Sequence, residues 1–229
     1  WTHPSLGEIS PLKFIPVAET NGAIIPLGDW VLATACRQLR YWQDNGLPEL
    51  NTSINVSSRQ LRDPSFPDRV CQILLANGVK PQFIELEITE SEALQSKACG
   101  DERLQPLRAL GIKIAIDDFG TGYSSLSRLK TLPIDRLKID QSFVGTMLTN
   151  NNDAVLVHAI VDLAHNLGLQ VTAEGVEIQA QLDFLRQHGC DYVQGYYFSR
   201  PMPEPVFRSF MERWGRFNFD SPARRLQAA

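Results

Sequence analysis

Residues 113–122 read K-I-A-I-D-D-F-G-T-G, and this stretch is the best starting point for the fold class. A short β-branched run ends in Asp117 and Asp118, and Gly120 and Gly122 follow at once. Apolar runs of this length are typical of buried parallel strands, and glycine permits backbone conformations at which a strand can break. The stretch therefore predicts a strand over Lys113–Ile116 with a polar loop at its carboxyl end.

The same unit, a β-branched run followed by an amphipathic stretch, repeats on both sides of this stretch from about Asn51 onward. This alternation is typical of parallel strands joined by crossover helices. We expect strands at Thr52–Val56, Phe83–Ile88, Lys113–Ile116, Arg136–Ile139, Gln170–Ala173 and Tyr192–Gln194. We expect helices at Ser10–Glu19, Trp30–Asn45, Phe66–Ala76, Glu102–Leu110, Leu126–Lys130, Ala154–Leu167, Ala180–His188 and Glu204–Arg213.

Six βα units in series fit either a doubly wound open sheet or a barrel, and a closed (β/α)₈ barrel needs two more strands. Those two strands would come first, and the sequence before Asn51 does not show them. We expect an α/β fold, a TIM-like (β/α)₈ barrel that lacks its N-terminal strands. Residues 1–229 would form a single domain, with a frayed end from about residue 217.

Composition narrows the classes of function. The formal net charge is −4, and the basic residues are spread along the chain, so the basic stripe of a protein that grips long nucleic acid is missing. Cys36, Cys71, Cys99 and Cys190 form no C-x-x-C pair, which favours neither a zinc site nor a disulfide framework. We therefore expect a cytoplasmic protein, or one at the cytoplasmic face of the membrane if an anchor precedes Trp1.

Polar residues recur where the expected strands end. They are Asn55, Glu87, Asp117, Asp118, Lys138, Glu174 and Gln194. In a barrel the carboxyl ends of the strands meet at one rim, where active sites of this fold are built. Neighbouring residues of a strand point to opposite faces, so Asp117 and Asp118 can address one centre only if the strand breaks there.

This set of side chains suits metal-assisted chemistry at phosphorus. Several carboxylates in a partly dry site repel one another unless cations neutralise them, and oxygen ligands favour Mg²⁺ or Mn²⁺. Two such ions can clamp an in-line displacement, with Asp117 as the bridge. Lys138 could stabilise a phosphoryl oxygen or orient water, and Glu174 could take a proton. The alternatives are a simple turn at Asp117–Asp118, and for Lys138 either an ion pair with Asp140 or a Schiff-base role.

Six motifs resemble those of one known family in order and spacing. They are N-V-S at 55–57, E-I-T-E-S at 87–91, D-D-F-G-T-G at 117–122, L-K-I-D at 137–140, A-E-G-V-E at 173–177 and Q-G-Y at 194–196. Together they resemble the EAL-domain family over nearly the entire chain. The resemblance implies a TIM-like barrel, two Mg²⁺ or Mn²⁺ ions, and hydrolysis of cyclic di-GMP to linear pGpG in bacterial signalling.

The resemblance also implies roles for individual residues. Metal ligands would be Asn55, Glu87, Asp117 and Asp118, with Glu174 as general base and Lys138 positioning the catalytic water. Gln194 would lie near metal and substrate, and Glu90 would steady the loop that follows Asp118. Separately from the resemblance, Glu177 could be another ligand, but we favour a supporting role or a cap for the helix that follows it. The substrate groove would be lined by Phe14 to Pro16 and Phe198 to Pro201.

One departure from the family pattern concerns the start of the chain. The Glu-Ala-Leu motif, with its metal-binding Glu, would lie just before Trp1, and residues 1–7 resemble the continuation of that motif. We therefore expect a longer protein. The resemblance implies that a sensory or diguanylate cyclase-like domain precedes this one and that the protein is a homodimer. The alternative function is a receptor that binds cyclic di-GMP without cutting it, although the retained Glu174 and Lys138 favour an enzyme.

Overall fold

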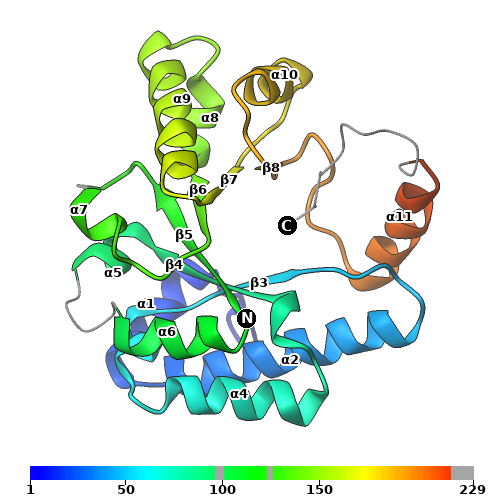
Figure 1. Ribbon diagram of the computed structural model, residues 1–229. Coiled ribbons are helices and arrows are strands. Elements are labelled where there is room, and N and C mark those ends of the chain that lie inside the picture. The colour runs from blue at the N-terminus through cyan, green and yellow to red at the C-terminus, as the bar shows by residue number, and fades with distance from the viewer. Residues whose placement is uncertain (96–100, 123–125, 218–229) are drawn as a thin grey trace.

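A curled sheet of parallel strands organises the chain (Figure 1). The computed structural model describes residues 1–95, 101–122 and 126–217. The sheet contains β3 (Thr52–Asn55), β4 (Ile84–Thr89), β5 (Lys113–Phe119), β6 (Arg136–Ile139), β7 (Gln170–Ala173) and β8 (Tyr192–Val193), hydrogen-bonded in that order. Each strand pairs in parallel with the next along the chain, so the order never reverses as it would in a doubly wound sheet.

The sheet is a partial, open half of a TIM-like barrel. Among the described residues, the edge strands β3 and β8 do not pair with each other. The expected fold class, a TIM-like barrel without its N-terminal strands, is therefore confirmed.

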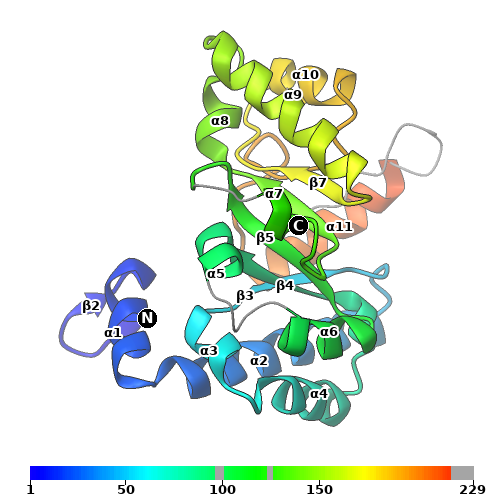
Figure 2. The same cartoon turned by 60° about the vertical axis from the view of Figure 1, so that its left-hand side comes forward.

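Helices surround the sheet in two groups (Figures 1 and 2). One group is α2 (Ile24–Asp44), α4 (Phe66–Asn77) and α6 (Asp101–Ala109), at the bottom of both views. The other is α8 (Gln141–Thr146), α9 (Asn151–Asn166) and α10 (Gln179–Gln187), at the top. Shorter helices lie between these elements along the chain, namely α3 (Ser58–Arg62), η1 (Pro81–Phe83), α5 (Glu90–Gln95) and α7 (Leu126–Leu129).

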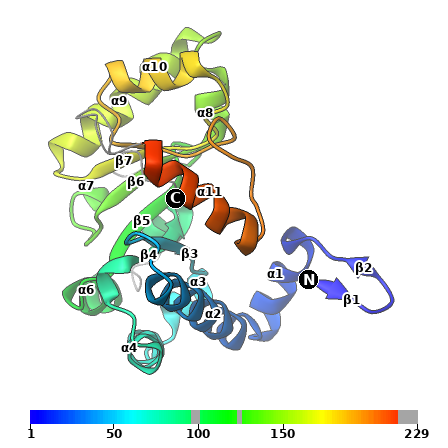
Figure 3. The same ribbon diagram turned by 90° about the vertical axis from the view of Figure 1, so that its right-hand side faces the viewer.

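The two ends of the described chain are placed differently (Figure 3). The hairpin of β1 (Thr2–His3) and β2 (Gly7–Glu8), followed by α1 (Pro11–Asn21), forms an arm that stands away from the sheet. Helix α11 (Glu204–Phe217) packs on α2, where the rings of Trp42 and Phe207 lie 4.9 Å apart. None of the described helices is both long and apolar enough to cross a membrane.

Side chains of each strand point alternately to the two faces of the sheet, so one face forms the hydrophobic core and the other carries the charged residues. In β4, Ile84, Leu86 and Ile88 are at most 1% exposed and belong to the hydrophobic core. Successive strand side chains point to opposite faces, so Glu85 and Glu87 lie on the other face of the sheet, also buried. Burying a large aliphatic side chain contributes about 1.5–3 kcal/mol, whereas burying a carboxylate costs free energy unless it is paired. The buried charges therefore need partners inside the curl of the sheet.

The structure corrects several boundaries. Strand β5 continues through both aspartates to Phe119, and Phe83 belongs to η1 and not to a strand. The sequence interpretation missed the β1–β2 hairpin and the short helices α3, α5 and α8, because two to six residues are too few to establish a period. The frayed end expected from about residue 217 lies outside the described residues, apart from Phe217 itself.

Candidate functional site

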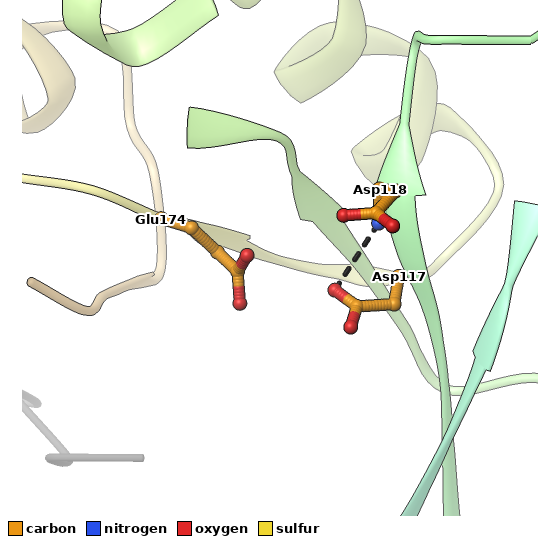
Figure 4. Close-up of side chains that lie close together, drawn as sticks. All are labelled: Asp117, Asp118 and Glu174. Carbon is orange, nitrogen blue, oxygen red and sulfur yellow. Dashed lines mark hydrogen bonds between the residues drawn. The ribbon is translucent and has the colours of Figure 1, made fainter. Parts of the chain in front are cut away.

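A bulge in β5 brings two adjacent carboxylates to one side of the sheet. The register between β5 and β6 shifts between Ile116 and Phe119, and Asp118 has a φ of 54°. Left-handed backbone is uncommon outside Gly, Asn and Asp, and a bulge re-aims the side chains beside it. The Asp118 N–H donates to Oδ1 of Asp117 at 3.1 Å (Figure 4). The strand was expected to break at the aspartates, but it continues through them, and a bulge within it brings both carboxylates to one centre.

A third carboxylate joins the pair from the other side of β6. Glu174 directly follows β7, and its N–H donates to the Ile139 carbonyl at 3.1 Å, which fixes the residue at the carboxyl end of the strands. Asp117, Asp118 and Glu174 each offer a carboxylate oxygen, and these oxygens lie within 4.8 Å of one another (Figure 4). Such an arrangement could hold a metal ion.

Lys138 in β6 lies between these strands and is the cationic centre of the site. Its Nζ lies 2.8 Å from Oε1 of Glu87 and 3.0 Å from Oδ1 of Asp117. It also lies 2.6 Å from Oε1 of Glu174, and only 4% of the lysine side chain is exposed. Asp140, the partner that the simpler interpretation offered, instead accepts a hydrogen bond from the Ser142 N–H at 3.0 Å and caps α8.

The site has more negative than positive charge. Glu87, Asp117, Asp118 and Glu174 stand against one ammonium group. Burial lowers the pKa of Lys138, but the carboxylates of Glu87 and Glu174 outweigh burial and raise that pKa above its ordinary value. Burial raises the pKa of Glu174 despite the lysine beside it. The pKa of Asp118 is also raised, mainly by burial and to a smaller extent by the negative charges of Asp117 and Asp140.

These shifts describe carboxylates that a further cation would stabilise in their charged form. All the donors are oxygens, which suits Mg²⁺ or Mn²⁺ better than zinc. The residues present therefore fit a divalent metal ion.

The two remaining expected ligands lie next to each other. Asn55 at the end of β3 is the register partner of Glu87 in β4, and the Val56 N–H donates to the Glu87 carbonyl at 2.9 Å. Glu87 joins the cluster through Lys138, and Asn55 is exposed at the same rim.

Glu90 holds the loop that follows Asp118. Its Oε2 accepts hydrogen bonds from the N–H groups of Gly120, at 2.8 Å, and Gly122, at 3.4 Å, and the residue is only 2% exposed. Gly120 has a φ of 103°, and a Cβ there would lie 2.9 Å from the Phe143 ring. Glycine at this position lets the loop lie against α8 while Glu90 binds its backbone.

Other residues singled out in the sequence lie around the cluster or away from it. Gln194 directly follows β8, and its carbonyl accepts from the Val176 N–H at 3.0 Å. Glu177 is exposed; the buried Gln181 accepts from the Glu177 and Ile178 N–H groups, at 2.8 and 3.1 Å, at the start of α10. The roles of Gln194 and Glu177 stay predictions.

The expected substrate-groove residues do not gather at one place with the carboxylates. Phe14 packs edge-on against Trp1 with ring centroids 6.1 Å apart, and Pro16 and Pro201 are exposed. Phe198 lines a cavity of about 350 Å³ between α11 and the amino-terminal ends of the strands, the opposite end from the cluster. Their contacts with substrate stay predictions.

Sequence reasoning missed Glu92, whose carboxylate bonds the backbone of two rim turns. Its signal is the pattern T-E-S-E at 89–92, a Thr followed three residues later by a Glu, which is typical of a capping box at the start of a helix.

Comparison with known proteins agrees with this geometry. A model of the EAL domain matches residues 1–201. The chain is 44% identical over 203 residues to the bifunctional diguanylate cyclase/cyclic di-GMP phosphodiesterase MucR of Pseudomonas aeruginosa, covering 89% of this chain and 30% of the relative. It is 42% identical over 229 residues to the cyclic di-GMP phosphodiesterase NbdA of the same organism, covering 100% and 29%.

A solved structure described as the PaMucR phosphodiesterase in complex with c-di-GMP superposes with a TM-score of 0.85. The two are 43% identical, and the alignment covers 90% of this chain and 84% of that one. The chain thus spans about 30% of the length of the curated relatives it matches.

Proposed function

The chain belongs to the EAL domain family, and from that premise we propose that it is a metal-dependent phosphodiesterase that opens cyclic di-GMP to linear pGpG. The observation that carries the proposal is the cluster of Asp117, Asp118 and Glu174 around the buried ammonium of Lys138. Simple binding of a dinucleotide does not need a base of this kind, whereas hydrolysis does.

The metal would be held by Asn55, Glu87, Asp117 and Asp118, and it would supply Lewis acidity and a more acidic water at the phosphodiester. The donors come from the ends of β3, β4 and β5, so the sheet itself sets their spacing. The bulge in β5 gives the site two carboxylates from consecutive residues.

Glu174 is the proposed general base. Burial raises its pKa, so its carboxylate accepts a proton more readily than an ordinary Glu does. The water oxygen bonds to phosphorus while Glu174 takes one proton of that water, and the bond from phosphorus to the ribose 3′ oxygen breaks. The departing 3′ oxygen takes up a proton from solvent and leaves as a hydroxyl, and the phosphate stays on the 5′ oxygen. Lys138, held 2.6 Å from Glu174, orients the water and opposes the negative charge that develops on the phosphoryl oxygens.

Cyclic di-GMP is proposed as substrate because relatives at 42–44% identity are named as cyclic di-GMP phosphodiesterases. Gln194 would contact the substrate near the metal, and Phe14, Pro16 and Pro201 would line the groove for the bases. Phe198 instead lines the cavity at the opposite end of the strands. Glu90 would keep the Gly120–Gly122 loop in place, and Glu177 would support the loop after β7.

The deciding experiment follows pGpG formation by chromatography in the purified protein of full natural length, with Mg²⁺ or Mn²⁺. We expect metal-dependent turnover that falls by at least about 100-fold in Glu174→Gln, because general-base catalysis contributes about 10²–10⁴-fold. The matched control is Glu212→Gln, which neutralises an exposed carboxylate paired with Arg208 on α11. Tight binding of cyclic di-GMP without turnover would instead support the receptor alternative.

The finer parts of the proposal are two metal ions per site, a homodimer, and a cytoplasmic location. Cys36, Cys71 and Cys190 are free thiols, which agrees with a reducing compartment. A sensory or diguanylate cyclase-like domain elsewhere in the full-length protein is also proposed, since the chain spans about 30% of its curated relatives. Metal titration and light scattering of the full-length protein test the stoichiometry and the dimer.

A further inference from the structure

Glu92 occupies a position from which one carboxylate bonds two loops of the site. It lies in the first turn of α5, which begins directly after β4. Oε2 accepts from the Thr89 N–H at 3.1 Å, and the Glu92 N–H donates to Thr89 Oγ1 at 3.4 Å. These two contacts form an ordinary capping box for α5.

The other carboxylate oxygen of Glu92 bonds a residue outside α5. Oε1 accepts from the Ser58 N–H at 2.7 Å, across 34 residues of sequence. Ser58 is the first residue of α3, which has a separate capping box between Ser57 and Gln60. Because α3 already has its own cap, the bond from Glu92 is an additional link between two helices that start just after neighbouring strands.

The link lies immediately behind two expected metal ligands. Ser58 is three residues beyond Asn55, and Thr89 is two residues beyond Glu87. The β3–β4 ladder holds Asn55 and Glu87 side by side, and Glu92 holds the two turns that follow them. Glu90 in the same first turn of α5 holds the loop after β5, so α5 contacts the loops beyond three consecutive strands.

We propose that Glu92 is a positioning residue: it fixes the turn after Asn55 against the turn after Glu87 and thereby sets the affinity of the site for a divalent metal. The inference rests on the proposed function, because it takes Asn55 and Glu87 as ligands. Residues that orient metal ligands typically change metal affinity by about 10–100-fold when removed. Glu92 acts through backbone, so we expect the lower end of that range.

Ser58→Pro tests the link without touching the carboxylate. Proline lacks the N–H that donates to Glu92, and it is favoured at the first position of a helix. The preceding Ser57 has φ −76° and ψ 156°, the extended conformation that a residue before proline requires. Ser58→Ala keeps the N–H and is the matched control, and Glu92→Gln removes the charge from the other partner.

The measurement is Mn²⁺ binding by titration calorimetry in the full-length protein without substrate, beside the Mn²⁺ dependence of hydrolysis. Ser58→Pro and Glu92→Gln should each weaken Mn²⁺ binding about 10-fold, and the double variant should be no weaker than the single ones. Saturating Mn²⁺ should restore kcat. Ser58→Ala should bind Mn²⁺ as the wild type does.

Equal Mn²⁺ affinity in Ser58→Pro and Ser58→Ala would overturn the inference, as would additive losses in the double variant or a lower melting temperature without a change in affinity. If the wild-type protein binds Mn²⁺ but does not hydrolyse cyclic di-GMP, the proposed function is overturned. The Mn²⁺ titrations of the variants would then still decide whether Glu92 sets the affinity for the metal. Wild-type protein that binds no Mn²⁺ would overturn both.

Discussion

Replacing Lys138 with Met would remove the ammonium group that contacts Glu87, Asp117 and Glu174, and it would keep an unbranched side chain one atom shorter. The three carboxylates that contact it are largely buried, with exposed side-chain fractions of 6% for Glu87, 15% for Asp117 and 18% for Glu174. Removing one partner of a buried ion pair costs about 3–5 kcal/mol, because the other partner stays buried and unpaired. We expect the metal-free protein to lose that much unfolding free energy.

The loss depends on pH in a defined direction. In the wild type the pKa of Lys138 is raised, so its contribution is fully present below the ordinary lysine value of about 10.4 and is lost only as pH rises through the higher folded value. The loss in the variant should therefore be constant between about pH 7 and 9. It should shrink as pH falls toward about 5, because Glu174 and Asp118, whose pKa values are raised, take up protons first.

Urea unfolding followed by circular dichroism in EDTA at pH 8 measures the effect. Lys130→Met is the control, since Lys130 is exposed, and a surface change of this kind stays within about 0.5 kcal/mol. Mn²⁺ at about 100 times its Kd should raise the unfolding free energy of the Lys138→Met variant by roughly 2.7 kcal/mol if the ion binds only the folded state. A variant as stable as Lys130→Met in EDTA would refute the reasoning that Lys138 neutralises buried carboxylates.

Two further predictions concern backbone and thiols. Gly120→Ala should destabilise the folded protein by about 1–3 kcal/mol, because φ is 103° at this residue and the new Cβ would lie 2.9 Å from the Phe143 ring. Gly145→Ala in α8 is the control: no atom lies within 4 Å of its Cβ, so this change should be neutral or stabilising. Calorimetric unfolding of both variants measures the difference in stability, and a Gly120→Ala variant as stable as Gly145→Ala would contradict the prediction. Burial raises the pKa of Cys36 to about 11 and that of Cys190 to about 12, so both thiols should resist iodoacetamide at pH 8 and react faster as pH rises. Mass spectrometry of the native protein checks this, and rapid labelling of either thiol would contradict it.

Much of this architecture could be predicted because it depends on repeated local patterns. The strands at Arg136–Ile139 and Gln170–Ala173 agree with the expected ranges, since short β-branched runs between glycine-ended helices give a clear signal. The placement of Asp117, Lys138 and Glu174 at one rim followed from strand ends alone.

What could not be predicted depends on contacts between distant residues. The sequence offered Asp140 as a partner for Lys138, and nothing local shows that Glu87 lies closer, 51 positions back along the chain. Likewise, the T-E-S-E pattern indicates a cap for α5, but not that the second oxygen of Glu92 bonds Ser58 in α3. Register between strands and the direction of individual oxygens decide such contacts, and neither has a local signature.

The strand order also has a consequence for how the protein is made. Within the part of the chain that the structure describes, each strand of the six-stranded sheet pairs only with its neighbours along the chain. A growing polypeptide can therefore add one strand–helix unit at a time to the edge of an existing sheet. The proposed catalytic residues arrive in the same order, from Asn55 to Glu174. A divalent metal held as proposed could therefore not stabilise the nascent chain through the whole cluster until Glu174, which follows β7, has emerged. Until then the earlier strands depend on burial of the apolar side chains of β4 and β5.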